Sequence, residues 1–155
     1  MRGWYTALVV LVACSHKAGD PNACPGGVYD LIPPDCDDVN CENIICDAVC
    51  PMGQTCPLLD CKDSPQCRLD CQGSADCTYI DCDQSDVCFI DCHDSATCEV
   101  SCLGAQDCTV GCETGAACLV HCGPASGSAC RFDMCDGSGM TDCGSGVIVC
   151  NRPCP

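Results

Sequence analysis

Residues 88–102 have the sequence Cys88-Phe-Ile-Asp-Cys92-His-Asp-Ser-Ala-Thr-Cys98-Glu-Val-Ser-Cys102. Two cysteine pairs, each enclosing three residues, are separated here by a spacer of five residues. Within each pair an aliphatic residue stands midway between the cysteines, which is the alternation of a β-strand with one buried face. We therefore expect both cysteines and Ile90 to point inwards, and Phe89 and Asp91 to point outwards.

The same unit recurs along the chain. Eight cysteine pairs follow one another, each pair encloses three or four residues, and every spacer between pairs has five. The paired residues are Cys46, Cys50, Cys56, Cys61, Cys67, Cys71, Cys77, Cys82, Cys88, Cys92, Cys98, Cys102, Cys108, Cys112, Cys118 and Cys122. A short fixed period of this kind predicts a solenoid. Small residues at the centre of the spacers predict tight corners between strands: Gly53, Ser64, Ser74, Ser85, Ser95, Ala105 and Gly115.

The size of one coil is left open by the spacing. A single-strand coil would have ten or eleven residues and would close a very narrow tube. The first four pairs enclose alternately three and four residues, so the longer repeat there is 21 residues, as from Cys46 to Cys67. We therefore favour a coil of two strands and 20–21 residues. In both arrangements stacked cysteines would lie about 4.8 Å apart, within disulfide reach, but the spacing does not determine which cysteines are bonded.

Composition supports a covalently braced all-β fold. The chain has 155 residues, of which 25 are cysteine, well above the share of about 8–10% that indicates a disulfide scaffold. The remaining apolar residues are too few to hold such a chain together by burial alone, so disulfides must supply the difference. This excludes a Rossmann domain, a TIM barrel and a helix bundle. We expect an all-β, disulfide-laddered β-solenoid with irregular disulfide-rich caps and high thermal stability.

The N-terminus has the features of an export signal. Residues 1–13 begin with the short positive segment Met1-Arg2-Gly3 and continue as an apolar run, Trp4 to Ala13, that is too short to span a bilayer. The run ends in Leu11-Val-Ala-Cys14, which resembles the lipobox of bacterial lipoprotein precursors. The resemblance implies cleavage before Cys14, acylation of Cys14 with chains such as palmitate, and a stable membrane anchor. Ser15 in the next position implies sorting to the outer membrane. The alternative is an ordinary signal peptide that leaves Cys14 as a spare thiol.

The cysteine count agrees with export and outlines the domains. Without Cys14 the chain has 24 cysteines, which can form twelve disulfides in an oxidising compartment. We expect a flexible linker from the lipidated residue to residue 34, the cysteine-repeat solenoid over 35–129, and a disulfide-rich C-terminal cap over 130–155. The ending Cys150-Asn-Arg-Pro-Cys154-Pro resembles those of secreted cysteine-rich proteins from gliding soil bacteria.

Motifs for metal thiolate chemistry and for catalysis are absent from the sequence. Zinc and metallothionein-like sites use cysteines separated by one or two residues, and neither spacing occurs anywhere in the chain. His16, His93 and His121 are isolated from one another, and neither a His-Glu-x-x-His motif nor a nucleophile elbow is present. We expect a protein that is not an enzyme and holds no cofactor, except that calcium remains open.

Acidic residues dominate the charge. The chain has 22 acidic and six basic side chains, and without Arg2 its net charge is about −17. Four aspartates, Asp60, Asp70, Asp81 and Asp91, each precede the second cysteine of a unit, so a solenoid would align them in one or two outward rows. Such rows could bind calcium, although we favour the interpretation that the charge keeps the open sheet edges soluble. A strong polyanion would repel nucleic acid, which we exclude as a partner.

Taken together, the lipobox, Ser15, the cysteine content and the C-terminal motif resemble the contact-dependent gliding-motility lipoproteins of gliding bacteria. The resemblance implies a non-enzymatic outer-membrane lipoprotein with a structural, adhesive or machinery role in gliding or cell–cell contact. Its partners would be the membrane, through the lipid, and other envelope or surface proteins; the periplasmic or surface-exposed location stays open. The alternatives are a calcium-stabilised acidic binding module and a small disulfide-rich inhibitor or toxin.

Overall fold

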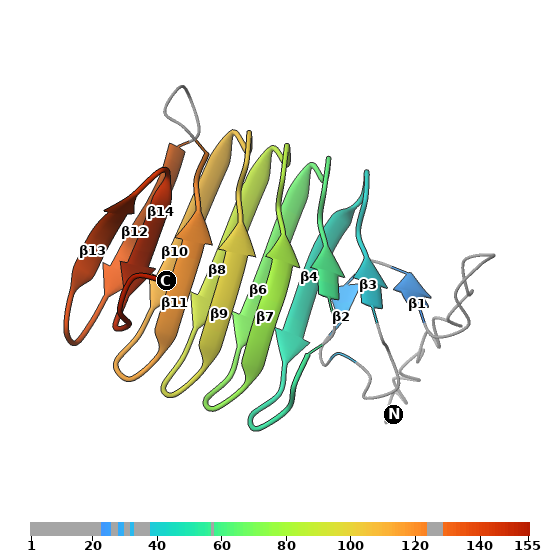
Figure 1. Cartoon of the computed structure of the whole chain (residues 1–155). Helices are drawn as coiled ribbons and strands as arrows, with labels where there is room; N and C mark the ends of the chain where they lie inside the picture. The colour runs from blue at the N-terminus through green and yellow to red at the C-terminus, as the bar shows by residue number, and fades with distance from the viewer. Residues whose placement is uncertain (1–22, 26–27, 30–31, 33–37, 57, 124–128) are drawn as a thin grey trace, which may run out of the picture.

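The computed structural model describes residues 23–25, 28–29, 32, 38–56, 58–123 and 129–155. The expected signal peptide, Cys14 and most of the expected linker lie outside these residues. All regular elements that are described are strands (Figure 1). They are β1 Ala23–Pro25, β2 Val28–Tyr29, β3 Asp38–Asn40, β4 Ile45–Cys50, β5 Leu58–Asp60, β6 Gln66–Cys71, β7 Asp76–Asp81, β8 Val87–Cys92, β9 Thr97–Ser101, β10 Asp107–Cys112, β11 Ala117–His121, β12 Ala129–Cys135, β13 Met140–Gly144 and β14 Val147–Cys150.

From β1 to β13, consecutive strands alternate between two facing sheets (Figure 1). Sheet A has the order β1-β3-β5-β7-β9-β11-β14-β13, and sheet B has the order β12-β10-β8-β6-β4-β2. Neighbouring strands from β1 to β12 are parallel, and their register places Cys46 beside Cys67, Cys67 beside Cys88 and Cys88 beside Cys108. One coil therefore contains two strands and 20 or 21 residues. The predicted β-solenoid with two-strand coils is confirmed.

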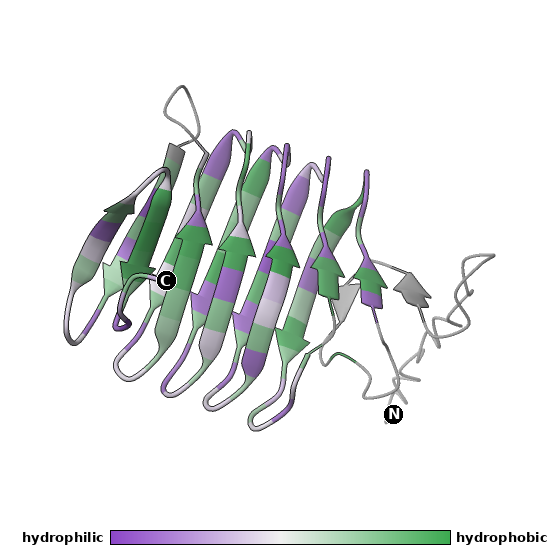
Figure 2. Cartoon of the chain, in the orientation of Figure 1, coloured by the Kyte–Doolittle hydropathy of each residue, from purple (hydrophilic) through white to green (hydrophobic). Residues whose placement is uncertain are grey.

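The interior is one aliphatic residue wide. Each strand from β3 to β11 contributes one inward aliphatic side chain that is at most 3% exposed, namely Val39, Ala48, Leu59, Leu69, Ile80, Ile90, Val100, Val110 and Val120. In β11 the outward Leu119 is buried as well. From Ala48 to Val110, buried cysteines flank these residues on both sides. In β8, Ile90 is buried whereas Phe89 and Asp91 are half-buried on the outer face, as the alternation predicts. Figure 2 shows the resulting mixture of hydrophobic and hydrophilic positions along the strands.

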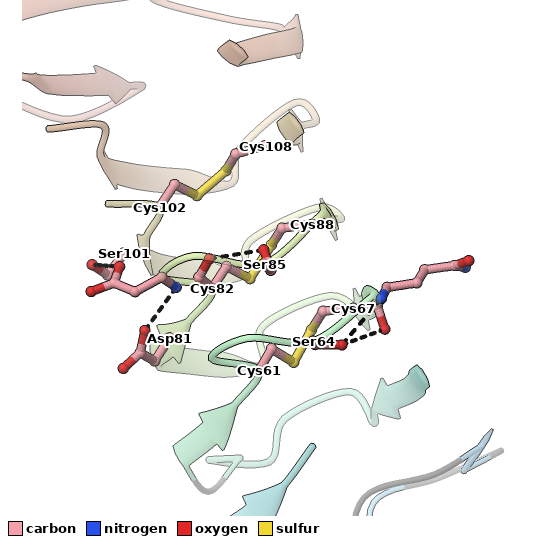
Figure 3. Close-up of a disulfide and its surroundings, with 12 residues drawn as sticks. Cys61, Ser64, Cys67, Asp81, Cys82, Ser85, Cys88, Ser101, Cys102 and Cys108 are labelled. Atoms are coloured by element: carbon pink, nitrogen blue, oxygen red, sulfur yellow. Dashed lines mark hydrogen bonds between the residues drawn. A yellow bond between two sulfur atoms is a disulfide. The ribbon is translucent and has the colours of Figure 1, made fainter. Parts of the chain in front are cut away.

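The disulfides cross the corners of the coils. Among the described residues, consecutive cysteines on the two sides of each corner are bonded, in the pairs Cys41–Cys46, Cys50–Cys56, Cys61–Cys67, Cys71–Cys77, Cys82–Cys88, Cys92–Cys98, Cys102–Cys108, Cys112–Cys118 and Cys122–Cys130. Each bond thus ties sheet A to sheet B. Three of them lie one above the other along one edge (Figure 3). Stacked cysteines of neighbouring coils are in register, but they are not bonded to each other.

The corners are of two alternating kinds. Three corners that lead from sheet A to sheet B bury their third residue, Ser64, Ser85 or Ala105, whereas Ile44 in the first such corner is exposed. Three corners that lead back from sheet B bury their fourth residue, Ala75, Ala96 or Ala116. The third residue of these returning corners often has a positive φ, as in Gly53 (φ +73°) and Ser74 (φ +57°). A small central residue therefore has two causes, tight burial in one kind of corner and left-handed backbone in the other.

A β-bulge explains why some cysteine pairs enclose four residues. In β7 the register against β9 shifts between Thr78 and Ile80, which leaves Tyr79 as an extra residue. Tyr79 has φ +103° and is 69% exposed. Strand β9 has no such extra residue, so only three residues separate Cys98 from Cys102. The coil is then 20 residues long instead of 21, as from Cys88 to Cys108. The bulge thus preserves the inward position of the aliphatic residue and both cysteines.

The two ends of the solenoid differ. Strands β1 and β2 lie at one end, and the antiparallel hairpin β13–β14 extends sheet A at the other (Figure 1). Strand β14 pairs antiparallel with β11, and disulfides Cys135–Cys150 and Cys143–Cys154 secure the hairpin. Sheet B ends with β12. Among the described residues there is no helix with the length and apolarity needed to cross a membrane.

Candidate functional site

The four aspartates singled out in the sequence form two separate pairs on opposite sheets. Asp60 and Asp81 are register partners on sheet A, and Asp70 and Asp91 are register partners on sheet B. The solenoid core separates the two pairs, so no single ion could contact all four carboxylates.

The pair on sheet A has a structural task that sequence analysis missed. Asp60 Oδ1 accepts a hydrogen bond from the backbone N–H of Lys62 at 3.2 Å, and Asp81 Oδ1 accepts one from Asp83 at 2.9 Å. The second of these bonds is drawn in Figure 3. Both are Asx-type contacts that fix the first turn of a corner. The sequence did contain a signal for these contacts, because each aspartate stands two residues before the residue whose N–H it binds.

In the next coil, Ser101 occupies the position that corresponds to Asp81. There the corner N–H is bound by Asp83, which lies in the preceding coil. Asp83 Oδ1 accepts hydrogen bonds from Leu103 N at 2.8 Å and from Ser101 Oγ at 2.6 Å. Carboxylates therefore gather at this corner. Burial raises the pKa of Asp81, the N–H of Asp83 opposes that shift, and the charges of Asp83 and Asp60 add to it.

On sheet B a histidine connects successive coils. His93 Nε2 lies 3.1 Å from Asp70 Oδ1, and His93 Nδ1 lies 2.9 Å from Glu113 Oε2. The hydrogen bond with Glu113 is the main reason why the pKa of His93 is raised, and the charges of Glu113, Asp70 and Asp91 act in the same direction. Burial raises the pKa of Asp91, while His93 and Arg68 lower it. His93, isolated in the sequence, is therefore part of an ionic cluster.

A depression lies on the outer face of sheet A beside the bulge. It has a volume of about 200 Å³, and its lining includes Leu58, Tyr79, Asp81, Glu99, Ser101 and His121. Glu99 Oε1 and His121 Nε2 are 3.6 Å apart across two neighbouring strands. Sequence analysis missed Tyr79, although the four-residue interval between Cys77 and Cys82 marked the strand with the extra residue.

The sulfur atoms of the described solenoid do not offer a thiolate site. Several cysteines lie close enough together to surround a metal ion, for example Cys71, Cys77 and Cys98. Each of these three is bonded in a disulfide, however, and a disulfide sulfur is not a thiolate ligand. The two described faces offer carboxylates, histidines, aromatic rings and the cations Arg68 and Arg131.

The proposed lipidation site, Cys14, lies outside the described residues. All sixteen cysteines of the predicted ladder are found in disulfides. No protein-family model, curated protein or solved structure matches this chain.

Proposed function

We propose that the protein is a non-enzymatic lipoprotein of the cell envelope that acts as a rigid contact or adhesive element. The observation that carries the proposal is the unbroken series of corner disulfides from Cys41–Cys46 to Cys122–Cys130. Disulfides of this density form and persist in exported proteins. Because each coil is braced across its corners, the body resists bending and suits a protein that must hold a surface at a fixed distance.

The geometry suits attachment at one end. The expected lipidated residue, Cys14, precedes β1, so the proposal places β1 and β2 nearest to the membrane and the β13–β14 hairpin farthest from it. Every added coil extends the stack by about 4.8 Å, the spacing between strands in a sheet. The net negative charge of the chain disfavours edge-to-edge association of these stacks. A stiff, acidic and membrane-attached rod is the expected result.

The anchor is tested by the intact mass of the natively purified protein, alkylated without prior reduction. We expect a chain that starts at Cys14, carries acyl chains and has no alkyl adducts. The variant Cys14→Ser should lose the acyl mass and leave the membrane fraction, whereas the control Ser15→Ala should keep its acylation. An unmodified soluble chain, or one with many alkylated thiols, would contradict the proposal.

The contact role is tested in the producing cells. Deleting the gene should weaken gliding or cell–cell contact, and a chromosomal copy with Cys14→Ser should fail to restore it even when the solenoid is secreted and folded. Restoration by the wild-type copy is the matched control. Normal gliding and normal contact in the deletion strain would exclude this role.

Calcium binding by Asp70 and Asp91 is a second proposal. The observation that favours it is that Asp70 and Asp91 are register partners on neighbouring strands, and that burial raises the pKa of Asp91; His93, whose Nε2 lies 3.1 Å from Asp70 Oδ1, would have to give way to the ion. Calcium would raise the melting temperature more than magnesium does, and the double variant Asp70→Asn/Asp91→Asn should lose the shift. Asp60→Asn, on the opposite sheet, is the control. An unchanged melting temperature in calcium would end this proposal.

A further inference from the structure

We propose that the depression beside Tyr79 binds one organic cation, the guanidinium or ammonium group of an arginine or lysine side chain on a partner. The inference concerns sheet A alone and does not depend on the lipid anchor. It assigns an organic cation to a surface whose Asp81 the sequence suggested only as a possible calcium ligand.

The bulge creates the depression. The register shift in β7 lifts Tyr79 out of the strand, while Thr78 remains beside Glu99 and Asp81 remains beside Ser101. The depression lies where the extra residue separates these two register pairs, and Tyr79, Asp81, Glu99 and Ser101 are part of its lining. Bulges often redirect side chains beside functional sites.

The charge of the depression fits a cation. Two carboxylates, Asp81 and Glu99, line it together with His121, whose Nε2 lies 3.6 Å from Glu99 Oε1. Around Asp81, the negative charges of Asp83 and Asp60 each act more strongly than the opposing charge of Lys62. Burial raises the pKa of Asp81, which means that its carboxylate is incompletely hydrated and would gain from an opposite charge. An anion would be repelled by the same groups. A neutral donor could hydrogen-bond to a carboxylate but would not neutralise its charge.

The walls of the depression fit a long side chain. Tyr79 is 69% exposed and Leu58 is 41% exposed, so an aromatic ring and an aliphatic group border the same space. An aromatic ring attracts a cation, and the apolar walls would cover the methylene groups of arginine or lysine. The volume of about 200 Å³ is smaller than the pockets that hold drug-sized ligands, and it suits a single side chain.

The first test is an NMR titration of the ¹⁵N-labelled, disulfide-intact protein with N-acetyl-arginine amide. The matched probe is N-acetyl-citrulline amide, which has nearly the same shape but no charge. We expect saturable shifts at Tyr79, Glu99 and Ser101 with arginine only, and weaker binding as the salt concentration rises. The absence of localised shifts, or equal shifts with citrulline, would overturn the proposal.

Substitutions separate a built site from general attraction to an acidic protein. Tyr79→Ala should raise the arginine Kd about two- to fivefold, the range for an exposed cation–π contact, and Tyr79→Phe should leave it unchanged. Glu99→Gln should raise the Kd, whereas Glu42→Gln, which removes the same charge at a remote corner, should not. Equal effects of Glu99→Gln and Glu42→Gln would overturn the assignment. Unchanged shifts far from the depression verify that each variant is folded.

Discussion

Removing one corner disulfide tests how much stability the covalent ladder contributes. In the variant Cys92→Ala/Cys98→Ala the lost bond joins residues six positions apart, and both are fully buried. Releasing a loop of this length from the unfolded chain costs about 2.3 kcal/mol. Each removed sulfur also leaves a void of roughly methyl size, which costs about 1 kcal/mol. The expected loss is therefore about 4 kcal/mol, a large part of the stability of an ordinary domain.

A second variant separates the two contributions. Cys143 and Cys154 are eleven positions apart, but Cys143 is only half-buried and Cys154 is exposed. Cys143→Ala/Cys154→Ala should therefore lose no more than about 2.7 kcal/mol, from loop closure alone. Both free energies of unfolding can be measured by circular dichroism in guanidinium chloride under non-reducing conditions. A smaller loss for the corner variant than for this one would refute the argument that buried sulfur fills the core.

Three further predictions concern single positions. Ile90→Ala should cost about 2–5 kcal/mol in chemical unfolding and Ile90→Val about 0.5–1.5 kcal/mol, because Ile90 is fully buried; equal costs would contradict the one-residue core. Deleting Tyr79 should leave the fold and the disulfides intact, since β9 forms without the extra residue; loss of the native disulfide map would show that the bulge is required. The raised pKa of His93 means that its protonation stabilises the fold, an effect fully present below pH 6.5 and lost as the pH rises through the higher folded value. Melting temperatures across this range should depend less on pH in Glu113→Gln, and an unchanged dependence would exclude the role of Glu113.

The periodic part of the structure could be predicted from the sequence because it follows from local geometry. Alternation placed Ile90 and its flanking cysteines inside, and the 21-residue repeat indicated the two-strand coil. Both results need only the strand period and the count of residues per coil.

The disulfide partners could not be predicted, since two arrangements satisfy the same distances. Cys71 and Cys77, which are bonded across a corner, have Cα atoms 6.6 Å apart. Stacked cysteines such as Cys71 and Cys92 are neighbours in register and would also lie within reach. The direction of the side chains, which depends on the path of each corner, decides between them.

The site residues were missed for a similar reason. Four residues between Cys77 and Cys82 imply one extra residue, but the count does not say which of the four leaves the strand. His93 contacts Asp70 and Glu113 on the two adjacent coils, and these contacts appear only once the coils are stacked in the correct register. The repeat pattern therefore could not predict contacts that form only between neighbouring coils.

The most direct test of the fold is a disulfide map of the unreduced protein. Cleavage before aspartate, under denaturing conditions with free thiols blocked, yields peptides 70–75, 76–80 and 91–93, and each of these contains one cysteine. The structure predicts that peptide 70–75 is linked to 76–80 through Cys71–Cys77. A link from 70–75 to 91–93, through Cys71 and Cys92, would mean that the disulfides join stacked coils and would contradict the corner-braced solenoid.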